Sequence, residues 1–98
     1  MPLYLASYDI QEKHHDEYQE LWDYFDQLKA VKILYSEYAV PFPDGAMDLA
    51  KKINNHLRPN DRLLVCELFN GDPIAWSSLL IETAAFQNLL TNYARALN

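Results

Sequence analysis

Asp9 stands where an apolar run ends, and its type and position could support chemistry. The run before it, from Leu3 to Tyr8, is typical of a strand buried in the middle of a sheet. An acid at the carboxyl end of such a strand lies at the rim of the sheet, where sites often form in α/β folds. Two interpretations stay open: Asp9 caps the turn that follows, or two copies related by a dimer two-fold hold one Mg²⁺ between them.

The other reactive side chains give weaker signals. Ser36 lies at an expected bend, where turn formation explains a serine, and a catalytic role is the alternative. His14 and His15 are adjacent, and neighbouring residues on a helix point about 100° apart, so they make a poor pair of metal ligands. Cys66 lies in the apolar run LLVCEL and is expected to be a small buried core residue. The sequence contains no glycine-rich phosphate loop and no Cys-x-x-Cys motif.

The elements that must position these residues follow from the hydrophobic pattern. Apolar and β-branched runs predict strands over residues 3–9, 31–34, 37–40 and 62–69. The middle two strands form a hairpin that bends at Tyr35 and Ser36. Apolar stripes at helical spacing predict helices over residues 14–29, 45–57 and 77–97. Asp44 is the expected N-cap of the second helix.

The predicted order is β-α-β-β-α-β followed by a C-terminal helix. This order is that of an α+β, ferredoxin-like split βαβ sandwich. Two helices would cover one face of the sheet, and the other face needs the third helix, a partner chain or both. The 98 residues suit one domain over residues 1–98.

The charge of the chain argues against non-specific nucleic-acid binding. The sequence has 14 acidic and 8 basic residues, a net charge of −6. A nucleic-acid surface usually needs a basic face, so nucleic acid remains a candidate partner that the charge disfavours. A local basic patch stays open as an alternative, formed by Lys51, Lys52, Arg58 and Arg62.

Size and composition also bear on the oligomeric state and the cellular compartment of the protein. A small domain with 13% aromatic residues favours a homodimer. The single cysteine permits no intramolecular disulfide, which suits a reducing, cytoplasmic environment. The N-terminus lacks the basic region of a signal peptide, and no segment approaches the ~20 apolar residues of a membrane span.

Three segments carry a resemblance to a known family. The first strand ends in Tyr8–Ile10, the hairpin contains Ile33–Ser36, and Asn60–Val65 is followed by Trp76. In this order and spacing, the segments resemble the CRISPR-associated Cas-two family over roughly residues 3 to 76, and most closely its stand-alone (SinR-like) relatives.

The resemblance implies a ferredoxin-like homodimer. It also implies that Asp9 is the catalytic metal ligand of a nuclease that uses Mg²⁺ or Mn²⁺, with Ser36 as the hairpin serine. In CRISPR systems the family dimer also serves as a non-catalytic DNA-holding scaffold.

Three functions therefore remain. The first is a non-catalytic scaffold or partner-binding module, and the second is a metal-dependent endonuclease of ribonuclease or toxin type. The third is an unrelated ferredoxin-like regulatory or small-molecule-binding domain. The acidic charge favours the first and third, whereas the position of Asp9 favours the second.

Overall fold

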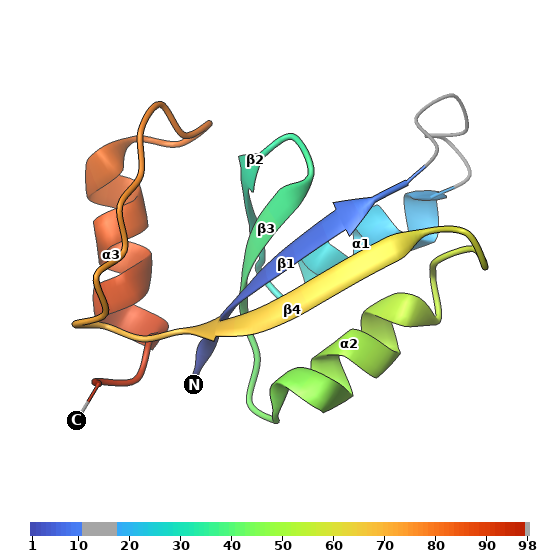
Figure 1. Ribbon diagram of the computed structural model, residues 1–98, viewed down its shortest axis with the longest axis horizontal. Helices are drawn as coiled ribbons and strands as arrows, with labels where there is room; N and C mark the ends of the chain where they lie inside the picture. Colours follow the sequence, from blue (N-terminus) through green and yellow to red (C-terminus); the bar gives the residue numbers. More distant parts are fainter. Residues whose placement is uncertain (11–17, 98) are drawn as a thin grey trace.

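The computed structural model describes residues 1–10 and 18–97. The elements follow in the order β1-α1-β2-β3-α2-β4-α3 (Figure 1). The strands are β1 (Leu3–Asp9), β2 (Val31–Leu34), β3 (Glu37–Pro41) and β4 (Arg62–Leu68). The helices are α1 (Gln19–Gln27), α2 (Ala46–Asn54) and α3 (Thr83–Tyr93). The α+β class and the predicted succession of strands and helices are confirmed.

The four strands form one antiparallel sheet in the order β2-β3-β1-β4. β1 is a central strand, as its apolar run predicts: Leu3 pairs with Pro41 of β3 on one side and with Leu68 of β4 on the other. β2 and β4 are the edges. The same register places Asp9 opposite Arg62.

Helices α1 and α2 pack on one face of the sheet, which we call the helix face (Figure 1). Alternate residues of β1 point into it, and the i, i+4 pairs of the helices meet them there. The buried residues of this core are Tyr4, Ala6, Tyr8, Tyr18, Leu21, Phe25, Val40, Phe42, Leu49 and Ile53. Its tightest aromatic contact stacks Phe25 on Tyr38 with ring centroids 4.1 Å apart.

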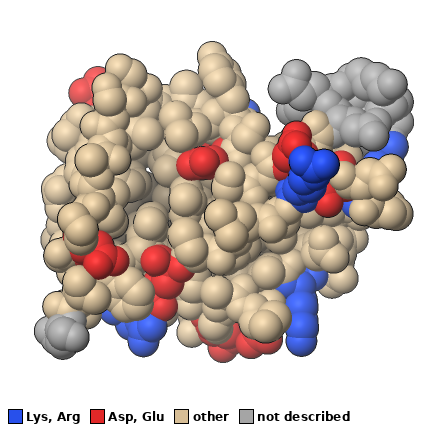
Figure 2. All heavy atoms as spheres, in the orientation of Figure 1, with Lys and Arg blue, Asp and Glu red and all other residues tan. Residues whose placement is uncertain are grey.

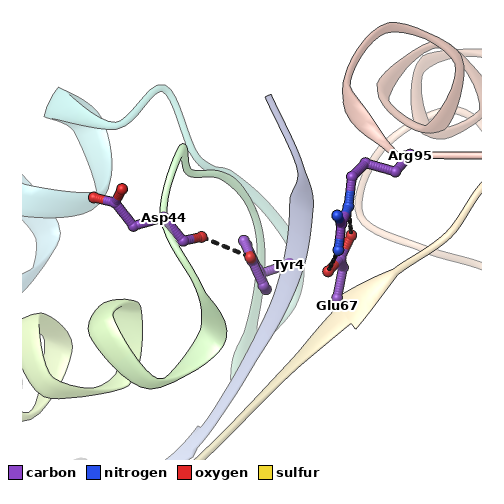
Figure 3. Close-up of polar contacts among 4 residues, drawn as sticks. All are labelled: Tyr4, Asp44, Glu67 and Arg95. Atoms are coloured by element: carbon purple, nitrogen blue, oxygen red, sulfur yellow. Dashed lines mark hydrogen bonds and ion pairs between the residues drawn. The ribbon is translucent and has the colours of Figure 1, made fainter.

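Helix α3 and the segment before it pack on the opposite, outer face of the sheet (Figure 1). The buried residues of this second core are Leu3, Ile33, Ala39, Phe86 and Leu90. Hydrogen bonds on both sides of α3 join this layer to the sheet. Before the helix, the Leu80 N–H donates to the Ile33 carbonyl at 2.9 Å, and after it Arg95 donates two 2.6 Å hydrogen bonds to Glu67 (Figure 3). The predicted cover of the outer face is therefore supplied in part by α3 of the same chain.

The predicted start of the C-terminal helix at residue 77 is wrong. Helix α3 begins at Thr83, and residues 74–82 form an irregular segment that we call the strap. Ser78 adopts a left-handed φ of 56°, which a continuous right-handed helix does not allow. The apolar side chains of the strap lie against the sheet instead of forming a helical stripe, and these are Ile74, Trp76, Leu79 and Ile81.

The N-cap prediction for Asp44 is also wrong. Gly45 is the N-cap of α2, and no side chain makes a capping hydrogen bond there. The backbone carbonyl of Asp44 instead accepts a 2.6 Å hydrogen bond from the Tyr4 hydroxyl, so Asp44 joins the loop to β1 (Figure 3).

The other helix ends also differ from the prediction. Helix α2 ends at Asn54, before residue 57. Helix α1 ends at Gln27 because Lys29 turns left-handed, with a φ of 60°, in the manner of a helix C-terminal motif. The predicted start of this helix at residue 14 lies outside the described residues.

Candidate functional site

A groove lies at the carboxyl end of β1 and brings the two predicted site residues together. Its volume is about 290 Å³. It is lined by Tyr8, Asp9, Ile10, Trp22, Lys32, Tyr35 and Ser36. We call it the Asp9 groove. Asp9 and Ser36, distant in sequence, share this surface because the β2–β3 turn folds against the end of β1.

Two hydrogen bonds hold that turn in place. The Tyr8 N–H donates to the Ser36 carbonyl at 3.0 Å, and the Tyr8 hydroxyl donates to the Tyr35 carbonyl at 3.4 Å. The predicted bend at Tyr35 and Ser36 is confirmed. The backbone of Ser36 thus has a structural role, and the residue also lines the groove.

Tyr8 is a packing residue. Its ring lies among those of Trp22, Phe25 and Tyr38, with centroids between 5.8 and 6.4 Å away. Burial, and to a lesser extent the neighbouring Tyr38, raises the pKa of the Tyr8 phenol above its ordinary value. The phenol therefore stays protonated at neutral pH and is unsuited to act as a base.

Asp9 faces solvent beside a cation. Its side chain is 74% exposed, and the Oδ2 atom lies 3.9 Å from Nη1 of Arg62, its cross-strand neighbour. An exposed ion pair of this kind contributes less than about 1 kcal/mol. Asp9 is accessible to a ligand, but a guanidinium already occupies part of its surroundings.

The described residues of one chain do not by themselves form a Mg²⁺ or Mn²⁺ site. Within residues 1–10 and 18–97, no group of three or more His, Cys, Asp or Glu side chains could hold a metal ion. Hard divalent cations need several oxygen ligands, and Asp9 supplies one carboxylate next to Arg62. The predicted metal site includes the Asp9 of a second copy as its other carboxylate. His14 and His15 lie outside the described residues.

Lys32 and Tyr35 are groove residues that the sequence did not single out. Tyr35 is 81% exposed at the turn, and the Lys32 ammonium lies 5.9 Å from its ring centroid. The groove thus carries a cation as well as the Asp9 carboxylate. One signal was present in the sequence: Lys32 is the single charge between the apolar residues Val31 and Ile33, so it points to the other face of the strand.

Two cations of the candidate basic patch have partners within the chain. Arg58 lies over the Tyr18 ring at 5.6 Å, and Arg62 faces Asp9. On the face shown in Figure 2, Lys and Arg side chains are dispersed among acidic ones. A phosphate backbone would meet no extended basic region on this face.

The outer face is uncovered at the carboxyl end of β1. Three cross-strand positions supply its residues, and we call Ser7, Asp9, Arg62, Leu64 and Cys66 the open patch. Leu64, opposite Ser7, is 63% exposed. Arg62, Leu64 and Cys66 of the patch belong to β4, an edge strand.

The expected burial of Cys66 is wrong. The residue is exposed, because α3 does not cover its part of the outer face. Its neighbours still desolvate the thiol in part. This effect, and then the Glu37 carboxylate, raises the pKa of Cys66 above its ordinary value. The thiol is accessible but poorly ionised, which disfavours a nucleophilic role.

Comparison of the chain with protein-family models, with curated proteins and with solved structures finds no match. The family resemblance in the sequence therefore remains a prediction. No helix in the described part of the chain has the length and apolar character needed to cross a membrane.

Proposed function

We propose that the chain is a homodimeric, ferredoxin-like module of Cas-two type that acts as a non-catalytic scaffold for a partner. The strand order supports the fold: β3 lies between β1 and β2, and β1 lies between β3 and β4. Each βαβ connection therefore skips one strand, and α1 and α2 cover the same face.

The open patch carries the dimer proposal. It combines an exposed leucine with an acid and a base on neighbouring strands. In a contact between two copies related by a two-fold axis, a residue i of the first copy that meets residue j of the second implies that j of the first meets i of the second. Arg62 of one copy would face Asp9 of the other, with Leu64 and Cys66 at the centre. An edge strand next to exposed apolar surface is also a place where proteins commonly associate.

The surroundings of Asp9 favour a scaffold over an enzyme. The carboxylate is paired with Arg62, and the described residues contain no cluster of three or more His, Cys, Asp or Glu side chains that could hold a metal ion. The dispersed cations and the net charge of −6 favour a protein partner over generic duplex DNA.

The test is the mass in solution. We expect light scattering at micromolar concentration to give about twice the 11.4 kDa of one chain. Leu64→Asp places a carboxylate at the centre of the contact and should give a monomer. Met47→Asp is the matched control, because Met47 is 70% exposed on α2, which packs on the other face of the sheet.

Circular dichroism on both variants separates dissociation from unfolding. A wild-type monomer, or a Leu64→Asp protein that keeps the dimer mass, contradicts the proposed interface.

The metal-dependent endonuclease remains a second candidate, favoured by one observation. Asp9, Ser36 and Lys32 line the same groove, where a phosphate could meet a cation and a hydroxyl. Asp9 would then be the residue that binds the metal, with the Asp9 of the second copy as its companion. Mg²⁺ or Mn²⁺ would supply charge neutralisation at the scissile phosphate.

A further inference from the structure

A second cavity lies between the outer face of the sheet, the strap and α3. Its volume is about 220 Å³. It is lined by Leu5, Ile33, Leu34, Glu37, Leu68, Ile74, Ala75, Trp76, Ser77, Leu79 and Phe86. Figure 2 shows the surface hollowed between the region over α3 and the region over the strands. We call it the α3 cavity. It is separate from the Asp9 groove, and the two share no lining residue.

Specific contacts fix the elements that form the walls of the α3 cavity. Trp76 meets Phe86 edge to face, with ring centroids 4.7 Å apart. The strap is tied to β2 by the hydrogen bond from the Leu80 N–H to the Ile33 carbonyl. Ser78 keeps a left-handed φ of 56°, a conformation that costs free energy in a residue with a side chain. The strap packs on the sheet through its apolar side chains, and residues 74–77 and Leu79 form one wall of the cavity.

One charged group is placed at this apolar space. Among the described residues that line the cavity, Glu37 alone carries a charge. The Ser7 hydroxyl donates a 3.2 Å hydrogen bond to Oε2 of Glu37, which orients the carboxylate. A hydrophobic cavity with one fixed polar group is the usual construction of a small-molecule site.

We propose that the α3 cavity binds a small arylalkylamine, a molecule with one aromatic ring, a short alkyl chain and a primary ammonium group. The ring would lie among the aliphatic side chains near Trp76 and Phe86, and the ammonium would donate to Glu37. This inference goes beyond the proposed scaffold function and does not depend on it.

Size and charge select this class of ligand. A dry apolar cavity of about 150 Å³ accommodates benzene, so about 220 Å³ leaves space for a short chain as well. Carboxylates and phosphates would meet the Glu37 carboxylate without a lining cation to neutralise them. Sugars would leave several hydroxyl groups without partners against aliphatic walls.

The test uses 2-phenylethylamine at millimolar concentration on the wild-type protein. The sequence contains two tryptophans, and only Trp76 lines the cavity. In ¹H–¹⁵N spectra, the Trp76 indole signal should shift saturably while the Trp22 signal stays in place. 2-Phenylethanol, which keeps the ring and loses the charge, should bind at least about tenfold more weakly, and phenylacetate should not bind.

Two variants test whether the Glu37 carboxylate binds the ammonium group. Glu37→Gln should weaken binding of 2-phenylethylamine about tenfold or more, as the loss of a charge-assisted hydrogen bond would. Glu82→Gln is the matched control: it removes the same charge from an exposed residue at the start of α3 that does not line the cavity. The Glu82→Gln protein should bind 2-phenylethylamine with the affinity of the wild type.

Several results would overturn the proposal. These are a Trp76 signal that does not respond to the amine, equal affinity for the amine and the alcohol, or equal losses in the two variants. A Trp76 signal that moves with protein concentration in the absence of amine would show that a second copy fills the cavity. The comparison of the three ligands needs no variant, so a Glu37→Gln protein that fails to fold does not prevent the test.

Discussion

The two faces of the sheet are built differently. Among the described residues, the core under α1 and α2 contains ten buried residues, whereas the core under α3 contains five. The helix face is closed by stacked aromatic rings, and the outer face combines a cavity, a strap and an uncovered patch. The helix face therefore supplies most of the stability, and the outer face supplies the surfaces that can bind.

The difference follows from how each layer is connected. Helices α1 and α2 are the connections of βαβ units, so their placement over the sheet is imposed by the strands on either side. The segment from residue 70 onwards follows the last strand and is held by packing and a few hydrogen bonds, among them those of Arg95 to Glu67. Such a layer can open locally while the rest stays folded.

The largest expected effect comes from removing a buried aromatic ring from each face of the sheet in turn. Phe25→Ala removes a fully buried ring from the helix face and should cost about 3–5 kcal/mol of the free energy of unfolding, a large share of the stability of a small domain. Phe86→Ala removes a ring of the same size from the outer face, where it is 3% exposed. We expect a smaller loss of global stability here, with faster amide exchange confined to the strap and α3.

Urea unfolding and hydrogen exchange on both variants measure the difference. Equal losses of global stability, with uniform exchange in the Phe86→Ala protein, would mean that the two faces form one cooperative unit.

A smaller effect concerns Cys66 on the open patch. Alkylation requires the thiolate, and the pKa of this thiol is raised, so iodoacetamide should react more slowly at pH 8 than with an unstructured cysteine peptide. The rate should keep rising with pH beyond the point where the peptide has levelled off. Mass spectrometry over time follows the reaction, and Glu37→Gln should increase the rate modestly.

The proposed dimer also affects the alkylation rate of Cys66. If a second copy covers the open patch, alkylation should slow further as the protein concentration rises, and Leu64→Asp should remove that protection. A Cys66 that reacts as fast as the peptide would contradict the assigned environment.

The smallest expected effect is at Asp9. Asp9→Asn removes the charge and keeps the shape, and because the ion pair with Arg62 is exposed we expect less than about 1 kcal/mol of lost stability. In the scaffold proposal, the wild type shows no Mg²⁺- or Mn²⁺-dependent cleavage of single-stranded RNA or duplex DNA, and the variant behaves identically. Metal-dependent cleavage by the wild type that is lost in a folded Asp9→Asn protein would establish the endonuclease instead.

Much of the fold was accessible to sequence reasoning because it depends on local patterns. The apolar run before Asp9 predicted a central strand, and the apolar stripes over residues 14–29 and 45–57 predicted the helices that cover the helix face. The hairpin bend at Tyr35 and Ser36 was also predicted, without an Asn-Gly or Asp-Gly signal. These features are set by residues within a few positions of one another.

The strap shows where local patterns fail. Residues 77–82 were predicted to start a helix, but Leu79 and Ile81 instead bury their side chains against the sheet, whose strands lie far away in sequence. Asp44 similarly has the side chain of an N-cap, and the Tyr4 hydroxyl binds its carbonyl outside the helix.

The sequence by itself determined which segments are strands and helices and that Asp9 ends a central strand, because hydrophobic periodicity encodes which side chains share a face. Only the tertiary structure decided that Arg62 stands opposite Asp9, that Lys32 shares its groove and that Cys66 is exposed. These relations depend on strand order and on how much of the outer face α3 covers. A period of two assigns a residue to one face of a strand, but it does not reveal what, if anything, covers that face.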